Sequence, residues 1–283
     1  MSIASFKELL VTARTGGYGV GAFNILNQLT ARAVVAAAER AGSPVILQTS
    51  VSTVKRFGVD EIIGFLRPLA KAASVPVAIH LDHCTDEALA KQCVDAGWTA
   101  VMIDGSALPF EENAAMTRRL VDYARPKGVD VEGEIGLIQG VEDNVKSDVT
   151  ALASVDDSLR FIKLTDVDAL APSIGTAHGV YTGEPVIQFD LVETLAKETD
   201  VPIVVHGGTG LKAEVFARLI GLGASKVNVS TAIKQAYLGA MLDYAADEKR
   251  SKNPLTVDAA IEKKVSDCVY DHLSMFGAIF QEA

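Results

Sequence analysis

The sequence predicts an α/β barrel, a (β/α)8 or TIM barrel of eight parallel strands each followed by a helix, with one extra C-terminal helix. Three observations predict it: eight apolar runs of strand length, helix-period segments between them, and a length of 283 residues. Such barrels take about 250 residues as a single domain. The runs lie at residues 17–25, 44–50, 76–83, 100–106, 130–136, 169–174, 202–208 and 226–230.

Most runs are almost wholly apolar until their last few residues, as PVAIHLDH at 76–83 shows. That pattern is typical of strands covered on both faces. A doubly wound open sheet is the alternative. It favours a glycine fingerprint after the first strand, and GGYGVGAFN does not place one there. We therefore prefer the barrel.

The segments between the runs have helical periodicity. Apolar residues in 62–69 repeat at intervals of three and four, which predicts a helix with one buried face. Capping pairs Ser154–Asp157 and Asp190–Glu193 predict two helix starts. Residues 253–283 form the expected extension, and no linker divides residues 1–283 into two domains.

The composition argues against several classes of partner. The formal net charge is −10 with no basic stripe, which disfavours non-specific binding to nucleic acid and to an anionic membrane. The chain has no apolar run of about 18 residues and no signal-peptide pattern. Its three cysteines match no zinc motif or disulfide framework. We expect a cytoplasmic protein that binds neither nucleic acid nor membrane.

Polar side chains gather at the C-terminal ends of the predicted strands. In a barrel these ends meet at one face, where active sites lie. A further residue, His178, follows the sixth strand closely enough to reach the same face. The strand-end residues are Asn24, Thr49, Ser50, His80, Asp82, His83, Asp104, Ser106, Glu132, Glu134, His206, Asn228, Ser230 and Thr231.

Three of the five histidines, His83, His178 and His206, follow three different strands. Three imidazoles around an open mouth are what a catalytic zinc needs, because a further position remains for substrate. The alternative is that each is a loop residue satisfied by hydrogen bonds. We expect His80 to orient a neighbour or to pack in the core, and His272 to be structural.

Asp82 and His83 are adjacent, so a regular strand would send them to opposite faces. We expect the pleat to break at the strand end, which would let both face the mouth. A carboxylate beside a metal-bound substrate is well placed to move protons. Asp82 is therefore the candidate acid/base, and the alternative is that it only orients a ligand histidine.

Glycine turns occur where an anion would bind. HGGTG at 206–210 and NVST at 228–231 each precede a predicted helix. Backbone N–H groups at helix starts bind phosphate, and barrels often bind it after strands seven and eight. The alternative is ordinary tight-turn chemistry.

With these motifs the chain resembles the class II, zinc-dependent ketose-bisphosphate aldolases of the fructose and tagatose type. The matching pieces occur in order and span nearly the whole chain. They are GAFNI (21–25), HLDH (80–83), VMIDGS (101–106), VEGEIG (131–136), GVED (140–143), GTAHGVY (175–181), HGGTGL (206–211) and NVST (228–231).

The resemblance implies a zinc ion held by His83, His178 and His206. It also implies that Asp82 moves a proton at the C4 hydroxyl as the C3–C4 bond breaks or forms. Glu142, in a loop, would move the proton at C3 of the dihydroxyacetone phosphate half. The positions implied for a second or alternate metal are Asp104 and Glu134.

The resemblance also implies where the substrate and a monovalent cation, Na⁺ or K⁺, would bind. The cation would lie near the carbonyls of Gly179 and Gly207. No strand-end lysine suits a Schiff base, which disfavours a class I aldolase. The substrate-binding candidates are Asn24, Ser50, Gly179, Gly207, Gly208, Thr209, Asn228, Ser230 and Thr231.

The sequence gives less support for a binding site at the aldehyde end of the substrate. Relatives carry Asp-Pro-Arg where this chain has Asn253-Pro254-Leu255, and they have Asp or Asn at the position of Ser230. Lys55 and Arg56 are candidates to hold the aldehyde-side anion in its place, unless they are solvated surface residues. The aldehyde could instead carry another group, such as a sulfonate.

Two other functions remain open at this point. A barrel metallohydrolase would use the same histidines to activate water, with Asp82 as base. A non-catalytic sugar-phosphate binding protein would need no acid/base. The sequence does not decide the stereochemistry at C4. We expect a sugar-phosphate substrate and, from the family, a homodimer or homotetramer.

Overall fold

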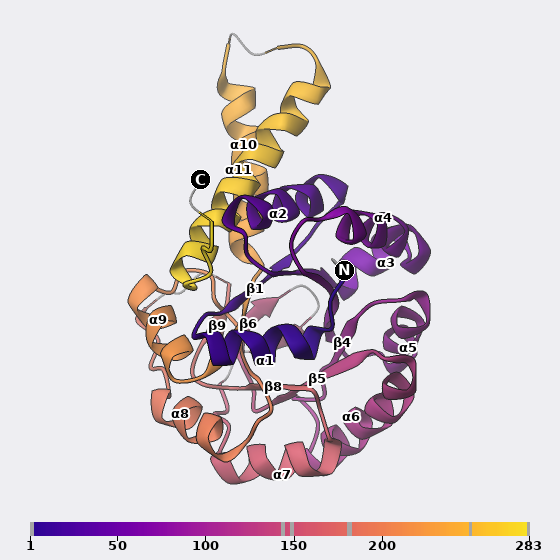
Figure 1. Cartoon of the computed structure of the whole chain (residues 1–283), viewed down its shortest axis with the longest axis vertical. Coiled ribbons are helices and arrows are strands. Elements are labelled where there is room, and N and C mark those ends of the chain that lie inside the picture. The colour runs from indigo at the N-terminus through magenta and orange to yellow at the C-terminus, as the bar shows by residue number, and fades with distance from the viewer. Residues whose placement is uncertain (1–2, 143–144, 148–149, 180–182, 249–250, 282–283) are drawn as a thin grey trace.

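Eight parallel strands close into a barrel in the computed structural model, which describes residues 3–142, 145–147, 150–179, 183–248 and 251–281 (Figure 1). Around the barrel the order is β1-β11-β10-β8-β5-β4-β3-β2. The predicted barrel is thus confirmed. The strands are β1 (Val20–Asn24), β2 (Val45–Ser50), β3 (Val77–Cys84), β4 (Ala100–Ile103), β5 (Asp130–Ile135), β8 (Ala169–Pro172), β10 (Ile203–Val205) and β11 (Ala224–Val229).

Helices form the outer layer of the barrel (Figure 1). None of the described helices is long and apolar enough to cross a membrane. Those that follow the barrel strands are α2 (Gln28–Ala41), α3 (Val51–Phe57), α4 (Val59–Ala72), α5 (Glu87–Ala96), α6 (Phe110–Ala124) with the short η1 (Arg125–Lys127), α7 (Val155–Thr165), α8 (Phe189–Glu198), α9 (Ala213–Gly221) and α10 (Thr231–Ala246).

One of the two predicted helix starts is confirmed and the other is wrong. Ser154 caps α7 by accepting a hydrogen bond from the Asp157 backbone N–H. Asp190 does not cap α8, because that helix already begins at Phe189 after Gln188. The backbone N–H of Gln188 bonds the carbonyl of Ile174, which fixes the chain one residue before the expected start.

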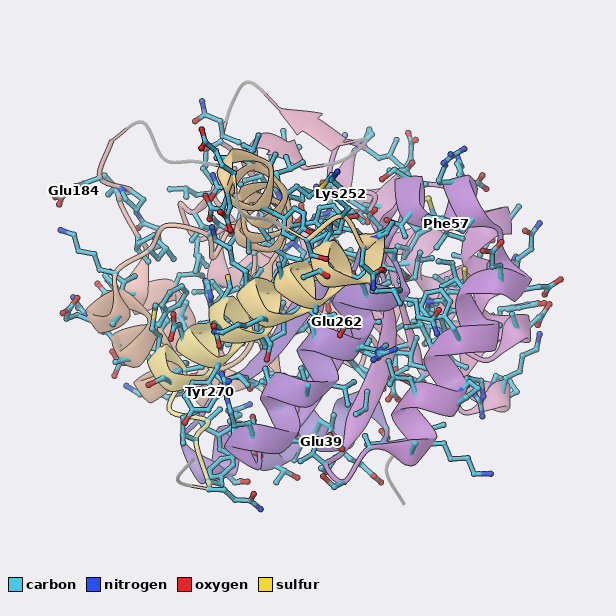
Figure 2. The ribbon with its side chains drawn as sticks, turned by 90° about the horizontal axis from the view of Figure 1, so that it is seen from above. Glu39, Phe57, Glu184, Lys252, Glu262 and Tyr270 are labelled. Atoms are coloured by element: carbon cyan, nitrogen blue, oxygen red, sulfur yellow. The ribbon has the colours of Figure 1, made fainter. Side chains whose placement is uncertain are left out.

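The expected C-terminal helix is α11 (Pro254–Met275), and it packs along α2 (Figure 2). Together with α10 it forms a helical hairpin whose far end projects beyond the barrel (Figure 1). The rest of α11 covers the outside of β1.

An N-terminal helix that the sequence analysis did not assign, α1 (Phe6–Gly16), crosses the N-terminal end of the barrel (Figure 1). It packs on small residues of the barrel interior, among them Ala22 and Ala78. Because these are alanines, the Phe6 ring can enter the barrel. It stacks on His80 with ring centroids 5.0 Å apart and an interplanar angle of 8°.

A second, three-stranded sheet accompanies the barrel in the order β7-β6-β9. It consists of β6 (Gln139–Glu142), β7 (Val145–Ser147) and β9 (Ala177–His178). The sequence analysis expected a loop at GVED, but Glu142 ends a strand and pairs with Val145. Because β6 also pairs with β9, this hairpin is tied to the strand that carries His178.

Candidate active site

The pleat of β3 breaks where the sequence analysis expected it. The register against β4 shifts between Leu81 and Cys84, and His83 has φ 44°. A non-glycine residue in this left-handed region costs about 1–3 kcal/mol and persists only when its surroundings hold it there. Its backbone N–H contacts the Met102 sulfur at 3.4 Å. The break lets His83 and Asp82 share the mouth of the barrel.

The structure brings His83, His178 and His206 together. Their ring centroids lie 4.6 Å apart for His83–His206, 5.0 Å for His83–His178 and 6.0 Å for His178–His206. One ligand atom from each lies within 4.8 Å of the others, and all three residues are buried. Sequence positions 83, 178 and 206 thus converge on one point.

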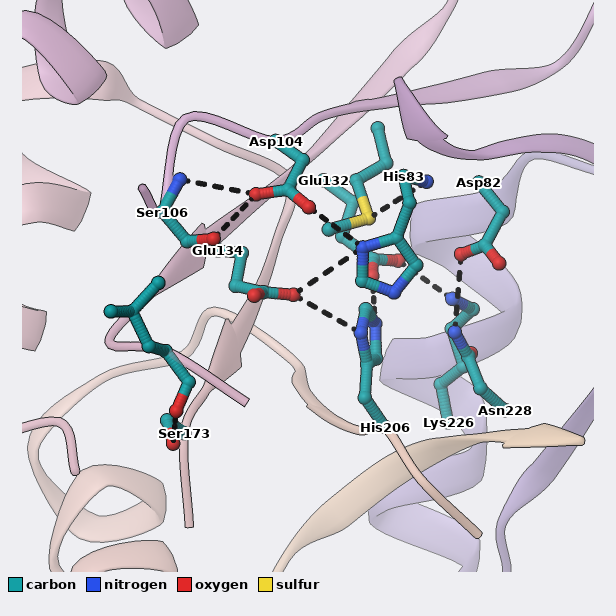
Figure 3. A network of polar contacts seen from close by, with 12 residues as sticks. Asp82, His83, Asp104, Ser106, Glu132, Glu134, Ser173, His206, Lys226 and Asn228 are labelled. Atoms are coloured by element: carbon teal, nitrogen blue, oxygen red, sulfur yellow. Dashed lines mark hydrogen bonds and ion pairs between the residues drawn. The ribbon is translucent and has the colours of Figure 1, made fainter. Parts of the chain in front are cut away.

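Carboxylates lie around two members of this cluster, His83 and His206 (Figure 3). His83 Nδ1 lies 2.8 Å from Asp104 Oδ2, and Asp104 also accepts hydrogen bonds from the backbone and hydroxyl of Ser106. Glu134 Oε2 lies 3.2 Å from His206 Nδ1 and 3.8 Å from His83 Nδ1. His83, Asp104 and Glu134 form a second group with metal-ligand spacing.

The charges in this cluster favour a cation. Burial alone would lower the pKa of His206, but its hydrogen bonds to Glu132 and Glu134 outweigh burial and raise that pKa to about 9. Burial also acts to lower the pKa of His83, and Asp82 and Asp104 raise it well above its usual range. A bound metal ion would displace these protons and take over their positive charge.

The donor set fits a divalent metal. A histidine that binds a metal usually donates its other ring N–H to a carboxylate. His83 has such a contact with Asp104, and His206 has one through Nε2 with Glu132 Oε1 at 2.8 Å. Three imidazoles, two of them with such carboxylate partners, suit zinc, and the one-histidine, two-carboxylate group beside them suits a harder cation.

Asp82 is held by two amides. Asn24 Nδ2 donates to one carboxylate oxygen at 2.9 Å, and Asn228 Nδ2 donates to the other at 3.2 Å. Both amides come from neighbouring strands, β1 and β11, which pair in the barrel. The carboxylate is 1% exposed and lies next to His83 in the chain. It is therefore a buried, oriented base at the metal cluster.

A buried ion pair lies beneath the histidines and was not expected from the sequence. Lys226 Nζ contacts Glu132 Oε2 at 2.8 Å, and both side chains are 0% exposed. Lys226 is the third residue of β11, with its ammonium inside the barrel. Glu132 thereby links Lys226 to His206.

Seven of the predicted substrate-binding residues line one small concavity. They come from the loops after β9 and β10 and from the end of β11, beside the start of α10. Within the described part of the chain, the buried Ser230 hydroxyl has no hydrogen-bond partner. The lining residues are Gly179, Gly207, Gly208, Thr209, Asn228, Ser230 and Thr231.

Other predicted residues are placed differently. Ser50 caps α3 and contacts the hydroxyl of Ser52 at 2.9 Å. Lys55 and Arg56 are exposed in the last turn of that helix. The backbone of Glu142 lies in β6, and its side chain is outside the described part of the structure.

Comparisons with known proteins agree with this geometry. Residues 4–280 match the family model for "Fructose-bisphosphate aldolase class-II". The chain belongs to the class II fructose-bisphosphate aldolase family. It is an aldolase, a carbon–carbon lyase, so the resemblance seen in the sequence is confirmed and the hydrolase and binding-protein alternatives fall away.

Individual members of the aldolase family match over almost the full chain. A fructose-bisphosphate aldolase of Geobacillus stearothermophilus is 38% identical over 281 residues, 98% of each chain. A sulfofructosephosphate aldolase of Alkalicoccus urumqiensis is 36% identical over 280 residues, again 98% of each. The crystal structure of the YdjI aldolase from Escherichia coli K12 superposes with a TM-score of 0.88 at 28% identity, covering 99% of this chain and 100% of that one.

Proposed function

We propose that this aldolase cleaves a ketose 1-phosphate or 1,6-bisphosphate of fructose or tagatose type reversibly. The products would be dihydroxyacetone phosphate and an aldehyde such as glyceraldehyde 3-phosphate. The observation that carries the proposal is the break in β3, which places the buried Asp82 carboxylate beside a three-histidine cluster at one mouth. The concavity around Ser230, lined by glycines and hydroxyl side chains, supports a phosphate site at this position.

His83, His178 and His206 would hold a zinc ion, and Asp104 with Glu134 would hold a second or alternate metal. When bound, a zinc ion stabilises the negative charge that develops on the ketose oxygens. Aldol cleavage then needs no Schiff-base lysine. Lys226, the buried lysine nearest the site, is bound by Glu132 and is not a nucleophile in this arrangement.

The chain itself moves the protons in this mechanism. Asp82 accepts the C4 hydroxyl proton, the C3–C4 bond breaks, and its electron pair passes to the dihydroxyacetone phosphate half. The C4 oxygen becomes the carbonyl of the released aldehyde. Glu142, at the end of β6, then returns a proton to C3. Its hairpin pairs with the strand of His178, which supports a position above the mouth.

The phosphate of the dihydroxyacetone half would bind where the chain turns into α10. Helix starts present backbone N–H groups to an anion, and Ser230 and Thr231 add hydroxyl groups. Gly207 and Gly179 have φ 70° and 89°, so both positions favour glycine, and their carbonyls are the candidate ligands of a Na⁺ or K⁺ ion.

Replacing Gly207 with alanine is expected to raise the KM for the ketose phosphate about tenfold or more. The added Cβ would lie 2.3 Å from the Ala177 carbonyl oxygen, and the positive φ adds about 1–3 kcal/mol of strain. Gly128→Ala is the matched control, because Gly128 has φ 69° with open space around it. Equal KM values for the two variants would contradict a binding function for this turn.

The group carried by the aldehyde end of the substrate, and the residues that contact it, decide which ketose phosphate is cleaved. Lys55 and Arg56 at the end of α3 are the candidate anion contacts, and the relatives' names include both a bisphosphate and a sulfo-sugar substrate. Cleavage rates for fructose 1,6-bisphosphate, tagatose 1,6-bisphosphate, and 6-sulfo and 6-deoxy ketose 1-phosphates would identify the substrate. An unchanged KM for all four in Arg56→Ala would reject Arg56 as a contact. Absence of cleavage for the whole panel would reject the proposed substrate class.

A homodimer or homotetramer is the expected assembly, and the projecting hairpin supports it. Leu238, Met241 and Leu242 form an exposed apolar stripe on α10, and Leu242 is 70% exposed. Leu242→Arg is expected to lower the molar mass measured by light scattering. Val11→Arg on α1, whose side chain is also exposed, should leave the mass unchanged. A monomeric wild type would contradict the assembly.

A further inference from the structure

Four buried side chains form a chain of hydrogen bonds that ends on the candidate acid/base. His80 Nδ1 lies 3.0 Å from Gln48 Oε1. Gln48 Nε2 donates to Asn24 Oδ1 at 2.7 Å, and Asn24 Nδ2 donates to Asp82 Oδ2 at 2.9 Å. None of the four is more than 1% exposed. This row of hydrogen bonds runs from the barrel interior up to the mouth.

The carboxylate at its end fixes the direction of this chain. A carboxylate only accepts, so Asn24 must present its NH₂ group to Asp82 and its oxygen to Gln48. Gln48 must then present its NH₂ group to Asn24 and its oxygen to His80. His80 must therefore carry its hydrogen on Nδ1. One end of the chain thus determines the tautomer at the other.

The surroundings of His80 match that tautomer. Phe6 of α1 stacks on the imidazole and fixes its plane. Its other nitrogen, Nε2, has no hydrogen-bond partner within the described part of the chain, as expected if it carries no hydrogen; Glu132 Oε2, which bonds Lys226, lies 3.5 Å away. Burial, with Lys226 next, lowers the pKa of His80 well below its usual range, so the ring is neutral. Lys226 supplies the positive charge that Glu132 needs.

We propose that His80 and Gln48 are positioning residues that hold Asp82 in its reactive orientation through Asn24. The inference rests on the proposed aldol reaction and adds residues to it. Asn24 stays a candidate to bind substrate, because its amide has a second N–H and a second lone pair besides those that bond Asp82 and Gln48. Without a donor at Gln48, the Asn24 amide could rotate and turn its oxygen against the carboxylate.

Two half-reactions separate this function from general structural support. Exchange of a C3 hydrogen of dihydroxyacetone phosphate with solvent requires the metal site and a base that removes that proton and returns it, but no acid/base at C4. Cleavage of the ketose phosphate also requires Asp82 at C4. Loss of the hydrogen bonds that link His80, Gln48 and Asn24 to Asp82 should therefore slow cleavage and leave exchange unchanged. A general loss of site structure would slow both.

The experiment compares His80→Phe, which keeps the stacking on Phe6, with Gln48→Met, which keeps the side-chain length. Thr165→Val is the control. It removes a buried hydroxyl that bonds the Phe161 carbonyl, far from the mouth on α7. Each protein is assayed for cleavage of its best substrate, for C3 hydrogen exchange, for bound metal and for Tm.

His80→Phe and Gln48→Met should each lower kcat for cleavage about 10- to 100-fold, as expected if the Asp82 carboxylate is slightly misplaced. They should keep wild-type exchange rates, metal content and KM, and the control should keep all rates. Equal losses of exchange and cleavage, or no loss of cleavage in folded variants, would overturn the positioning proposal. A wild-type enzyme that performs neither reaction would reject the proposed function, and the positioning proposal with it.

Discussion

Replacing His206 by alanine is expected to remove both the bound divalent metal and the cleavage activity. His206 supplies one of three imidazoles in the cluster, and its contact with Glu132 fixes the ring. Charge stabilisation of several kcal/mol by a metal corresponds to a loss of about 10³-fold or more in rate. Metal content by elemental analysis and cleavage by a coupled assay would be measured on the same preparation.

His272→Ala is the matched control for this loss. His272 lies on α11, bonds the Cys268 carbonyl and packs edge-on against Phe23, away from the cluster. It should lower Tm while metal content stays at the wild-type level. The metal proposal would be wrong if the His206 variant kept a full equivalent of metal, or if cleavage by the wild type survived complete removal of metal by a chelator.

Asp82→Asn is expected to lower kcat for cleavage by about 10²- to 10⁴-fold, the usual contribution of a positioned acid or base. The amide cannot take the C4 proton, and it would place a donor against Asn24 or Asn228, which both donate to this position. Bound metal and C3 hydrogen exchange should persist, because the three histidines are unchanged.

Asp86→Asn is the control for the same chemical change. Asp86 caps α5 with its carboxylate four residues further along, and asparagine caps helices equally well. This variant should keep wild-type kcat. If Asp82→Asn also kept it, Asp82 would be only an orienting residue for His83, which is the alternative considered from the sequence.

The barrel could be predicted because each strand shows a recognisable pattern of apolar residues in its own short stretch of sequence. Buried parallel strands are apolar until their ends, and the polar ends must meet once the barrel closes. That argument placed His83, His178 and His206 together. The broken pleat at His83 followed from the same reasoning, since the adjacent Asp82 and His83 cannot share a face of a regular strand.

The parts that were missed depend on contacts between distant segments. Strands as short as β9 have no periodicity to detect. Helix α1 has an apolar face, but only the alanine-lined barrel end gives that face its place. The buried pair of Glu132 and Lys226 joins β5 to β11, which are not neighbours in the barrel, so its signal lies in the closed structure rather than in either strand.

The position of α1 has a consequence for the order in which the protein assembles. Phe6 precedes every barrel strand in the chain, but the barrel end that receives it includes Val204 of β10 and needs β11 to close. We therefore expect the apolar face of α1 to be covered only once these late strands are in place. Docking of α1 then completes the stack on His80, so a segment that comes before the barrel strands is expected to join the fold after them.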